Sequence, residues 1–116
     1  MFDYETATAK ILAEKVPLCD ECQGVLKPDV VFFGESVKHL RECQELAQSA
    51  DLFFVVGSSL VVTPAAFIPS MTSGSIVVVH KGDMSHMYLP KERIGIQAEE
   101  DIDTFFKEVN RHLALV

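Results

Sequence analysis

Residues 52–59 of the chain read LFFVVGSS, a run of large apolar residues that ends at a glycine and two serines. A continuous apolar run of this length, bounded by turn-forming residues, is typical of a strand buried on both faces of a sheet. The same pattern occurs at residues 30–33 (VVFF), before Gly34, and at residues 76–79 (IVVV), before His80. The sequence therefore predicts three buried strands, each followed by small or polar residues.

Segments with apolar residues at helical spacing alternate with these strands. Asp3 can cap a first helix, and Thr63 can cap a short helix whose first residue is Pro64. The apolar stripe of the second helix includes Cys43. Strands that alternate with helices indicate an α/β fold, with a parallel sheet and flanking helices. The expected helices are residues 4–15, 38–49, 64–68 and 99–113, and residues 93–96 predict a short edge strand.

The size and charge of the chain limit its function. Its 116 residues suffice for one domain with a single core, and 10 basic against 17 acidic residues give a net charge of −7. Because no basic cluster is present, the sequence argues against binding to nucleic acid. No apolar run approaches the roughly 18–20 residues of a membrane span. Residues 1–4 (MFDY) do not resemble a secretory signal, so a cytoplasmic location is expected.

Small or polar residues follow each predicted strand, at residues 34–36, 57–59 and 80–83. In parallel sheets, ligands bind where the strands end at their carboxyl termini. These segments therefore predict a binding crevice, although ordinary surface loops have the same composition. His80, at a strand end, is a better candidate for ligand contact than His86, which lies in a loop.

The cysteines indicate metal binding or free thiols rather than disulfides. Cys19 and Cys22 are separated by two residues, a spacing that supplies one side of a tetrahedral zinc site. The same spacing also occurs in reduced thiol pairs and redox motifs. His39 and Cys43 lie one helical turn apart and could complete the site. Alternatively, Cys43 is a core residue and His39 a surface residue.

Two long blocks of the sequence resemble a known family. Residues 19–35 (CDECQGVLKPDVVFFGE) and residues 50–66 (ADLFFVVGSSLVVTPAA) are similar to consecutive blocks of the sirtuins, the NAD-dependent protein deacylases. The resemblance implies that residues 1–116 are one partial catalytic domain, the C-terminal half of a Rossmann-like fold. Within it, residues 1–28 are half of a zinc module and residues 29–116 are the α/β part.

The resemblance also implies roles for individual residues, with NAD and zinc as the cofactors. Cys19 and Cys22 match two of the four zinc ligands. Acylated lysine is bound by residues that form the walls of a tunnel and the two edges of a peptide site: Val31, Phe33, Gly34, Glu35 and Val62. NAD is bound through its ribose and adenine by Gly57, Ser58, Ser59, His80, Lys81, Gly82, Asp101 and Ile102.

The family's glycine-rich loop, catalytic histidine and first cysteine pair have no counterpart here, so no catalytic residue is assigned. His80 stands where the family usually has asparagine. The leading hypothesis is a deacylase fragment that acts on acylated-lysine proteins or peptides and needs a missing N-terminal half or a partner chain. The alternatives are a non-catalytic module that binds acyl-lysine peptides or proteins, and a small zinc-binding interaction domain.

Overall fold

The computed structural model describes residues 1–13, 16–85 and 88–114, so Lys15 and His86 lie outside the described residues. The chain divides into two compact units, Met1–Ser36 and Val37–Val116. The first unit thus includes residues 29–36, which the sequence prediction assigned to the α/β part. In the described part of the chain, no helix has the length and apolar character needed to cross a membrane.

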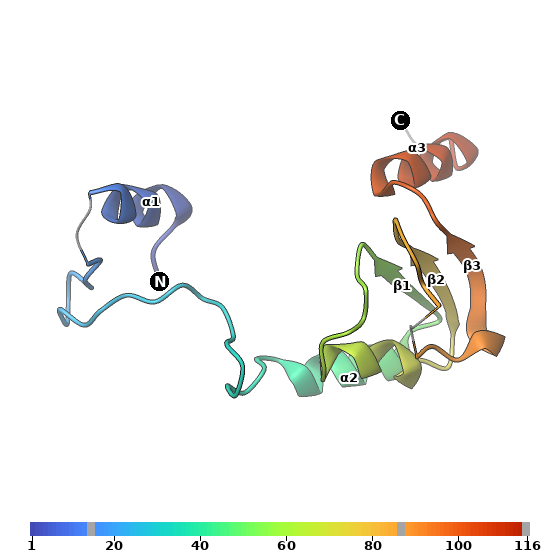
Figure 1. Cartoon of the computed structure of the whole chain (residues 1–116), viewed down its shortest axis with the longest axis horizontal. Helices are drawn as coiled ribbons and strands as arrows, with labels where there is room; N and C mark the ends of the chain where they lie inside the picture. Colours follow the sequence, from blue (N-terminus) through green and yellow to red (C-terminus); the bar gives the residue numbers. More distant parts are fainter. Residues whose placement is uncertain (14–15, 86–87, 115–116) are drawn as a thin grey trace. The chain divides into compact units, whose positions relative to one another are not determined.

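The unit Met1–Ser36 begins with helix α1, Tyr4–Leu12 (Figure 1). The Asp3 side chain accepts a hydrogen bond from the Thr6 N–H at 2.8 Å, which confirms Asp3 as the helix cap. None of the α1 residues is buried. Further along this unit, Leu18 and Val25 form an antiparallel bridge that closes the turn carrying the two cysteines.

The unit Val37–Val116 contains a parallel sheet of three strands in the order β1-β2-β3, which confirms the α/β prediction (Figure 1). The strands are β1 (Leu52–Val56), β2 (Ser75–Val79) and β3 (Ile94–Ala98). The register between β2 and β3 shifts next to Ile76, so Gly95 has no partner in the ladder. A glycine suits such a bulge because it has no side chain to pack.

The core of this unit is built on the central strand β2. Val78 is only 1% exposed, and it packs with Val55 of β1. Burying each such side chain contributes about 1.5–3 kcal/mol. The prediction that residues 52–56 are buried on both faces is wrong, because β1 lies at the sheet edge and Leu52 and Phe54 are exposed. The buried apolar residues are Ala47, Val55, Ile76, Val77, Val78 and Val79.

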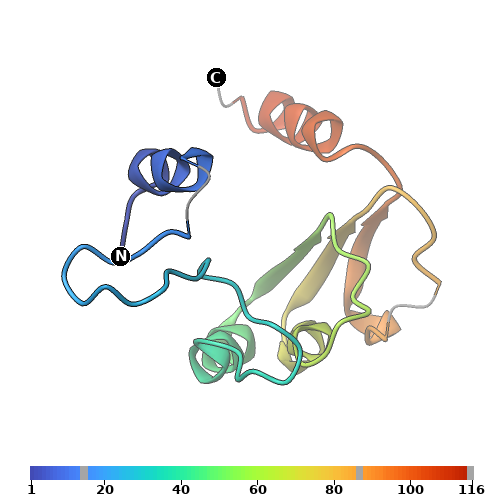
Figure 2. The same cartoon turned by 60° about the vertical axis from the view of Figure 1, so that its left-hand side comes forward.

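The helices of this unit are α2 (Leu40–Ser49), the 3₁₀ helices η1 (Ala65–Met71) and η2 (Lys91–Arg93), and α3 (Ile102–His112). Helices α2 and η1 lie against each other (Figure 2). The α-helix expected at residues 64–68 is a 3₁₀ helix, which fits the presence of Pro69, a residue with no N–H to donate. Thr63 does not cap it, because Pro64 occupies the cap position without a side-chain bond.

Two predicted helix starts are too early. Helix α2 begins at Leu40 because His39 adopts the left-handed conformation (φ 55°), which cannot continue into a helix. Helix α3 begins at Ile102 rather than Glu99, because Asp101 caps it. The prediction of Cys43 as a core residue is also wrong: Cys43 is exposed, and Ala47 is the buried residue of α2.

The strand predicted at residues 30–33 is absent. These residues lie outside the three-stranded sheet, and Val31 and Phe33 are exposed, by 98% in the case of Phe33. The chain instead turns, with the Glu35 N–H bonded to the Phe32 carbonyl at 3.0 Å. Without a neighbouring strand in its own unit, the segment has neither ladder hydrogen bonds nor cover for its apolar side chains.

Candidate functional site

The three strands end at the same edge of the sheet (Figure 1). Just beyond the strand ends, the Gly57 N–H donates to the Val79 carbonyl at 2.8 Å, and the His80 N–H donates to the Ala98 carbonyl at 3.1 Å. These bonds hold the segments that follow β1, β2 and β3 next to one another. The structure therefore brings together, within one unit, the two loops and the helix start that the family resemblance assigned to NAD.

Gly57 links the end of β1 to the start of α3. Its φ is +64°, a conformation that side-chain-bearing residues rarely adopt. A Cβ atom at this position would lie 2.9 Å from the Cδ1 atom of Ile102, which is closer than carbon atoms tolerate. A side chain at position 57 would therefore strain the backbone and displace the end of the Ile102 side chain, so the two predicted cofactor residues are in direct proximity.

The serine that follows Gly57 is held by its own loop. The Ser58 Oγ accepts a hydrogen bond from the Leu60 N–H at 3.2 Å. A hydroxyl group that accepts one bond keeps its proton for another, so Ser58 can still donate to a ligand oxygen. Ser59 is half-buried beside it. Ser58 therefore presents a hydroxyl group at the strand end, and a hydroxyl group is suited to binding a ribose.

The loop after β2 and the start of α3 complete the edge. His80 and Gly82 are half-buried, and Lys81 is exposed. The Asp101 carboxylate accepts from the N–H groups of Asp103 and Thr104, at 3.0 and 3.2 Å. Because the helix already uses this carboxylate, Asp101 shapes the site mainly by fixing where α3 begins. The sequence reading missed this capping role, which the aspartate before an apolar stripe signals.

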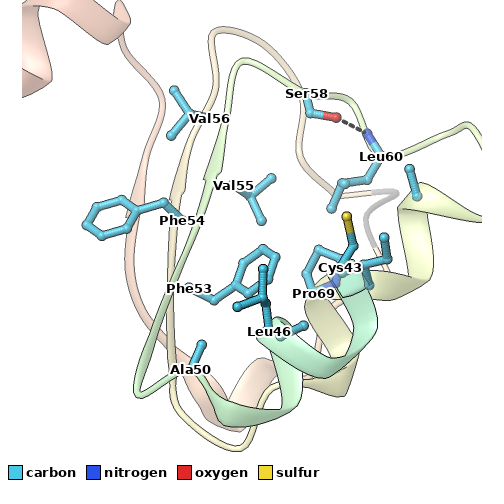
Figure 3. Close-up of a pocket in the computed structure, with 13 residues that line it drawn as sticks. Cys43, Leu46, Ala50, Phe53, Phe54, Val55, Val56, Ser58, Leu60 and Pro69 are labelled. Atoms are coloured by element: carbon cyan, nitrogen blue, oxygen red, sulfur yellow. Dashed lines mark hydrogen bonds between the residues drawn. The ribbon is translucent and has the colours of Figure 1, made fainter. Parts of the chain in front are cut away.

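An apolar groove of about 530 Å³ lies between α2, β1 and η1 (Figure 3). Phe53, Val55 and Leu60 direct their side chains into it, and Cys43 lines its wall. Phe54 extends from the other side of β1, where its ring centroid lies 6.1 Å from that of Phe106 in α3. Sequence reasoning missed this groove, because it expected α2 and β1 to be covered.

The turn that carries Cys19 and Cys22 is closed by backbone hydrogen bonds. The Cys19 N–H donates to the Gly24 carbonyl at 2.9 Å, and the Gln23 N–H donates to the Cys19 carbonyl at 3.0 Å. The N–H groups of Cys22 and Glu21 donate hydrogen bonds that lower the pKa of the Cys19 thiol. Donors of this kind stabilise the thiolate, which is the form that binds zinc.

Among the described residues, no group of three or more histidine, cysteine or acidic side chains is placed to hold a metal ion. His39 and Cys43 belong to the unit Val37–Val116, and the His39 Nδ1 lies 2.7 Å from the Glu42 carboxylate. Completion of the zinc site by these two residues therefore has no support from the geometry.

The predicted substrate residues are divided between the two units. The unit Val37–Val116 contains Val62, which is exposed. In the unit Met1–Ser36, Val31 and Phe33 are exposed, and Gly34 has a φ of +89°. Glu35, which follows Gly34, accepts from the Lys27 Nζ at 2.7 Å, a contact that sequence reasoning missed.

Comparisons with known proteins identify the family. The Sir2 family profile matches residues 1–64, which is more than half of the chain. The chain belongs to the Sir2 family. An NAD-dependent protein deacetylase of Thermotoga maritima is 41% identical over 87 residues, 71% of this chain and 35% of that protein. An NAD-dependent protein deacylase of Pyrobaculum aerophilum is 40% identical over 110 residues, 90% of this chain and 44% of that protein.

Solved sirtuin structures match the whole fold. A structure described as Sir2 with a p53 peptide and NAD⁺ has a TM-score of 0.80 at 32% identity, over 99% of this chain and 48% of that one. A Sir2 structure bound to a propionylated peptide gives the same score over 49% of its chain. The chain thus spans about half of these sirtuin structures, and the family predicted from the sequence is confirmed.

Proposed function

We propose that this chain takes part in the NAD-dependent removal of acyl groups from protein lysines, as part of an incomplete catalytic domain. The observation that carries the proposal is the convergence of the segments after β1, β2 and β3 at one edge, with Gly57 against Ile102. Support comes from relatives named as NAD-dependent protein deacetylases and deacylases, and from similar structures that contain NAD and acylated peptides.

The residues at this edge fit NAD. The hydroxyl groups of Ser58 and Ser59, the N–H groups of residues 58–59 and 81–82 and the His80 side chain would bind the ribose, and the start of α3 at Asp101 and Ile102 would hold the adenine. Gly57 and Gly82 both have positive φ, which lets the backbone approach a ligand closely. When bound, NAD would supply an electrophilic ribose carbon, with nicotinamide as its leaving group. This chain's residues would orient the cofactor for attack at that carbon.

The acyl-lysine would be bound by the exposed segment that carries Val31 and Phe33. An apolar wall favours a neutral acylated lysine over the charged lysine, because burying an unpaired ammonium group is costly. The peptide backbone would add as a strand beside Gly34-Glu35, and main-chain hydrogen bonds of this kind give affinity with little sequence preference. Phe33 is 98% exposed, so its ring is accessible to a ligand.

The edge strand β1 supports the proposal that the domain is incomplete. Leu52, Phe54 and Val56 are exposed along it, and the apolar groove lies on one face. An uncovered apolar strand edge is an unstable feature in an isolated protein, since it offers free hydrogen-bonding groups to other chains. We propose that an N-terminal half, in the same chain or in a partner, covers this edge and supplies the catalytic histidine that acts as general base.

Zinc belongs to the same proposal. Cys19 and Cys22 would supply two of four thiolate ligands, because their turn directs backbone N–H groups toward the Cys19 sulfur. The remaining two ligands would come from the N-terminal half.

A cytoplasmic location also stays a prediction, which cell fractionation tests.

Nicotinamide release tests the proposed function. The 116-residue chain is incubated with NAD and an acetyl-lysine peptide, alone and with the N-terminal half of the Thermotoga maritima relative. We expect no turnover from the chain alone and nicotinamide release from the mixture. Turnover by the chain alone would contradict the incomplete domain. No turnover in any mixture would contradict the deacylase proposal.

A second candidate is a non-catalytic module that binds acyl-lysine peptides. Phe33 favours it, because this exposed ring belongs to the unit Met1–Ser36, whereas the proposed NAD residues belong to the unit Val37–Val116. This candidate predicts peptide binding that needs no NAD and no N-terminal half. Binding measured by fluorescence anisotropy, together with the absence of turnover in the mixture, would favour the module.

A further inference from the structure

Glu35 closes a tight turn with Phe32. The Glu35 N–H donates to the Phe32 carbonyl at 3.0 Å, and the Phe32 N–H donates to the Glu35 Oε2 at 3.0 Å. The bonds are reciprocal, so main chain and side chain of Glu35 both hold the same residue. Gly34, at φ +89°, allows the chain to reverse between them. Phe33 lies within this turn.

Lys27 holds Glu35 from outside the turn. Its Nζ lies 2.7 Å from the Glu35 Oε1 and 2.9 Å from the Oε2, a two-oxygen contact. The same ammonium group lies 5.0 Å from the centroid of the Phe32 ring, within the range of a cation–π interaction. One cation therefore binds both residues that close the turn.

Phe32 and Phe33 differ in their contacts and in their exposure. Phe32 is 56% exposed beneath the Lys27 ammonium, whereas Phe33 is 98% exposed. The lysine thereby leaves Phe33 as the ring that is available to a ligand. All of these contacts lie within the unit Met1–Ser36.

The charges at the turn also affect ligand choice. If Lys27 were absent, the negative charge of Glu35, two residues from Phe33, would attract the ammonium group of an unmodified lysine. Lys27 neutralises this carboxylate and repels a second ammonium group. The ion pair therefore penalises the charged lysine while leaving a neutral acyl-lysine unaffected, which is specificity by repulsion.

We propose that Lys27 is a positioning and specificity-determining residue of the acyl-lysine site. It holds Glu35 so that Phe33 and the Gly34-Glu35 backbone are set for an extended peptide, and it disfavours unmodified lysine. The inference rests on the proposed function, because it assumes that this segment binds acylated lysine.

Fluorescence anisotropy tests the proposal on the full chain, with an acetyl-lysine peptide and the same peptide carrying unmodified lysine. For Lys27→Met we expect a roughly 3–10-fold loss of affinity for the acetylated peptide and a reduced preference over the unmodified one. Lys27→Arg, which keeps the charge, should retain both. The double variant Lys27→Met/Glu35→Gln should recover the preference, because the carboxylate charge is gone, while affinity stays low.

Lys10 provides a matched control in the same unit. Its Nζ lies 2.7 Å from the Asp20 carboxylate and 5.1 Å from the Phe2 ring centroid, so Lys10→Met removes the same two kinds of contact. We expect it to leave peptide binding unchanged. Unchanged affinity and preference in Lys27→Met, with intact binding by the unsubstituted chain, would overturn the inference alone. If the unsubstituted chain binds neither peptide, alone or with the N-terminal half, the proposed function fails and the inference fails with it.

Discussion

Two apolar runs of the same length have opposite surroundings. Residues 76–79 (IVVV) form most of β2, and all four are buried. Residues 30–33 (VVFF) lie outside the sheet with exposed side chains. The central strand has a neighbour on each side, whereas residues 30–33 have no neighbouring strand in their own unit. An apolar run in the sequence therefore predicts apolar side chains that must be shielded from water. A neighbouring strand can shield them, and so can a ligand or another segment.

The same substitution in both runs gives the largest expected contrast. Val78→Ala should lower the free energy of unfolding by about 1.5–3 kcal/mol, because Val78 is 1% exposed. Val31→Ala should change it by less than about 0.5 kcal/mol, as is usual for exposed positions. Urea denaturation followed by circular dichroism measures both. Equal losses would break the comparison, since they would mean that residues 30–33 are buried in solution.

Gly57→Ala tests how tightly the end of β1 is packed against α3 in the unit Val37–Val116. The left-handed backbone should cost about 1–2 kcal/mol, and the contact with the Ile102 Cδ1 should add to that. Ile102→Val removes this atom, so the added cost should vanish in the double variant, as a double-mutant cycle in urea would show. Gly34→Ala, at positive φ with open space around it, should show the backbone cost only. An Ile102→Val background that leaves the cost unchanged would argue against the contact.

Phe33→Ala tests whether the exposed run at residues 30–33 binds a peptide. We expect at least a tenfold loss of affinity for an acetyl-lysine peptide, equivalent to about 1.4 kcal/mol, with the unfolding midpoint unchanged. The reason is that Phe33 contacts almost nothing in its own unit. Ile11→Ala, at an exposed apolar residue of α1 in the same unit, serves as the control and should leave the affinity unchanged. A large loss of stability in Phe33→Ala would show that the ring packs within the protein.

The smallest expected effect concerns α1. Hydrogen bonds from the Thr6 backbone and side chain lower the pKa of Asp3, so its carboxylate stabilises the helix. Because the folded pKa lies below the ordinary value of 3.8, this contribution is complete above that pH and is lost as pH falls through the folded pKa. Helical circular dichroism should decrease slightly over this acidic range. Asp3→Asn, which still caps but does not titrate, should remove that part of the decrease.

Most of the framework was predictable from local patterns. The runs at residues 52–56 and 76–79, the edge strand near Gly95 and the cap at Asp3 correspond to β1, β2, β3 and α1. Helix starts were less accurate, because they depend on which single residue supplies the cap. Asp101 and the left-handed His39 decide two of them.

The sequence by itself determined the family, the parallel α/β architecture and the segments that carry candidate ligand contacts. These features depend on local composition and on long blocks of residues in a fixed order, both of which are visible in the sequence alone. Only the tertiary structure decided which apolar runs are covered, that Gly57 meets Ile102, and that Lys27 reaches Glu35. The physical reason is that burial and electrostatic contacts depend on neighbours distant in the chain, which apolar patterning does not specify.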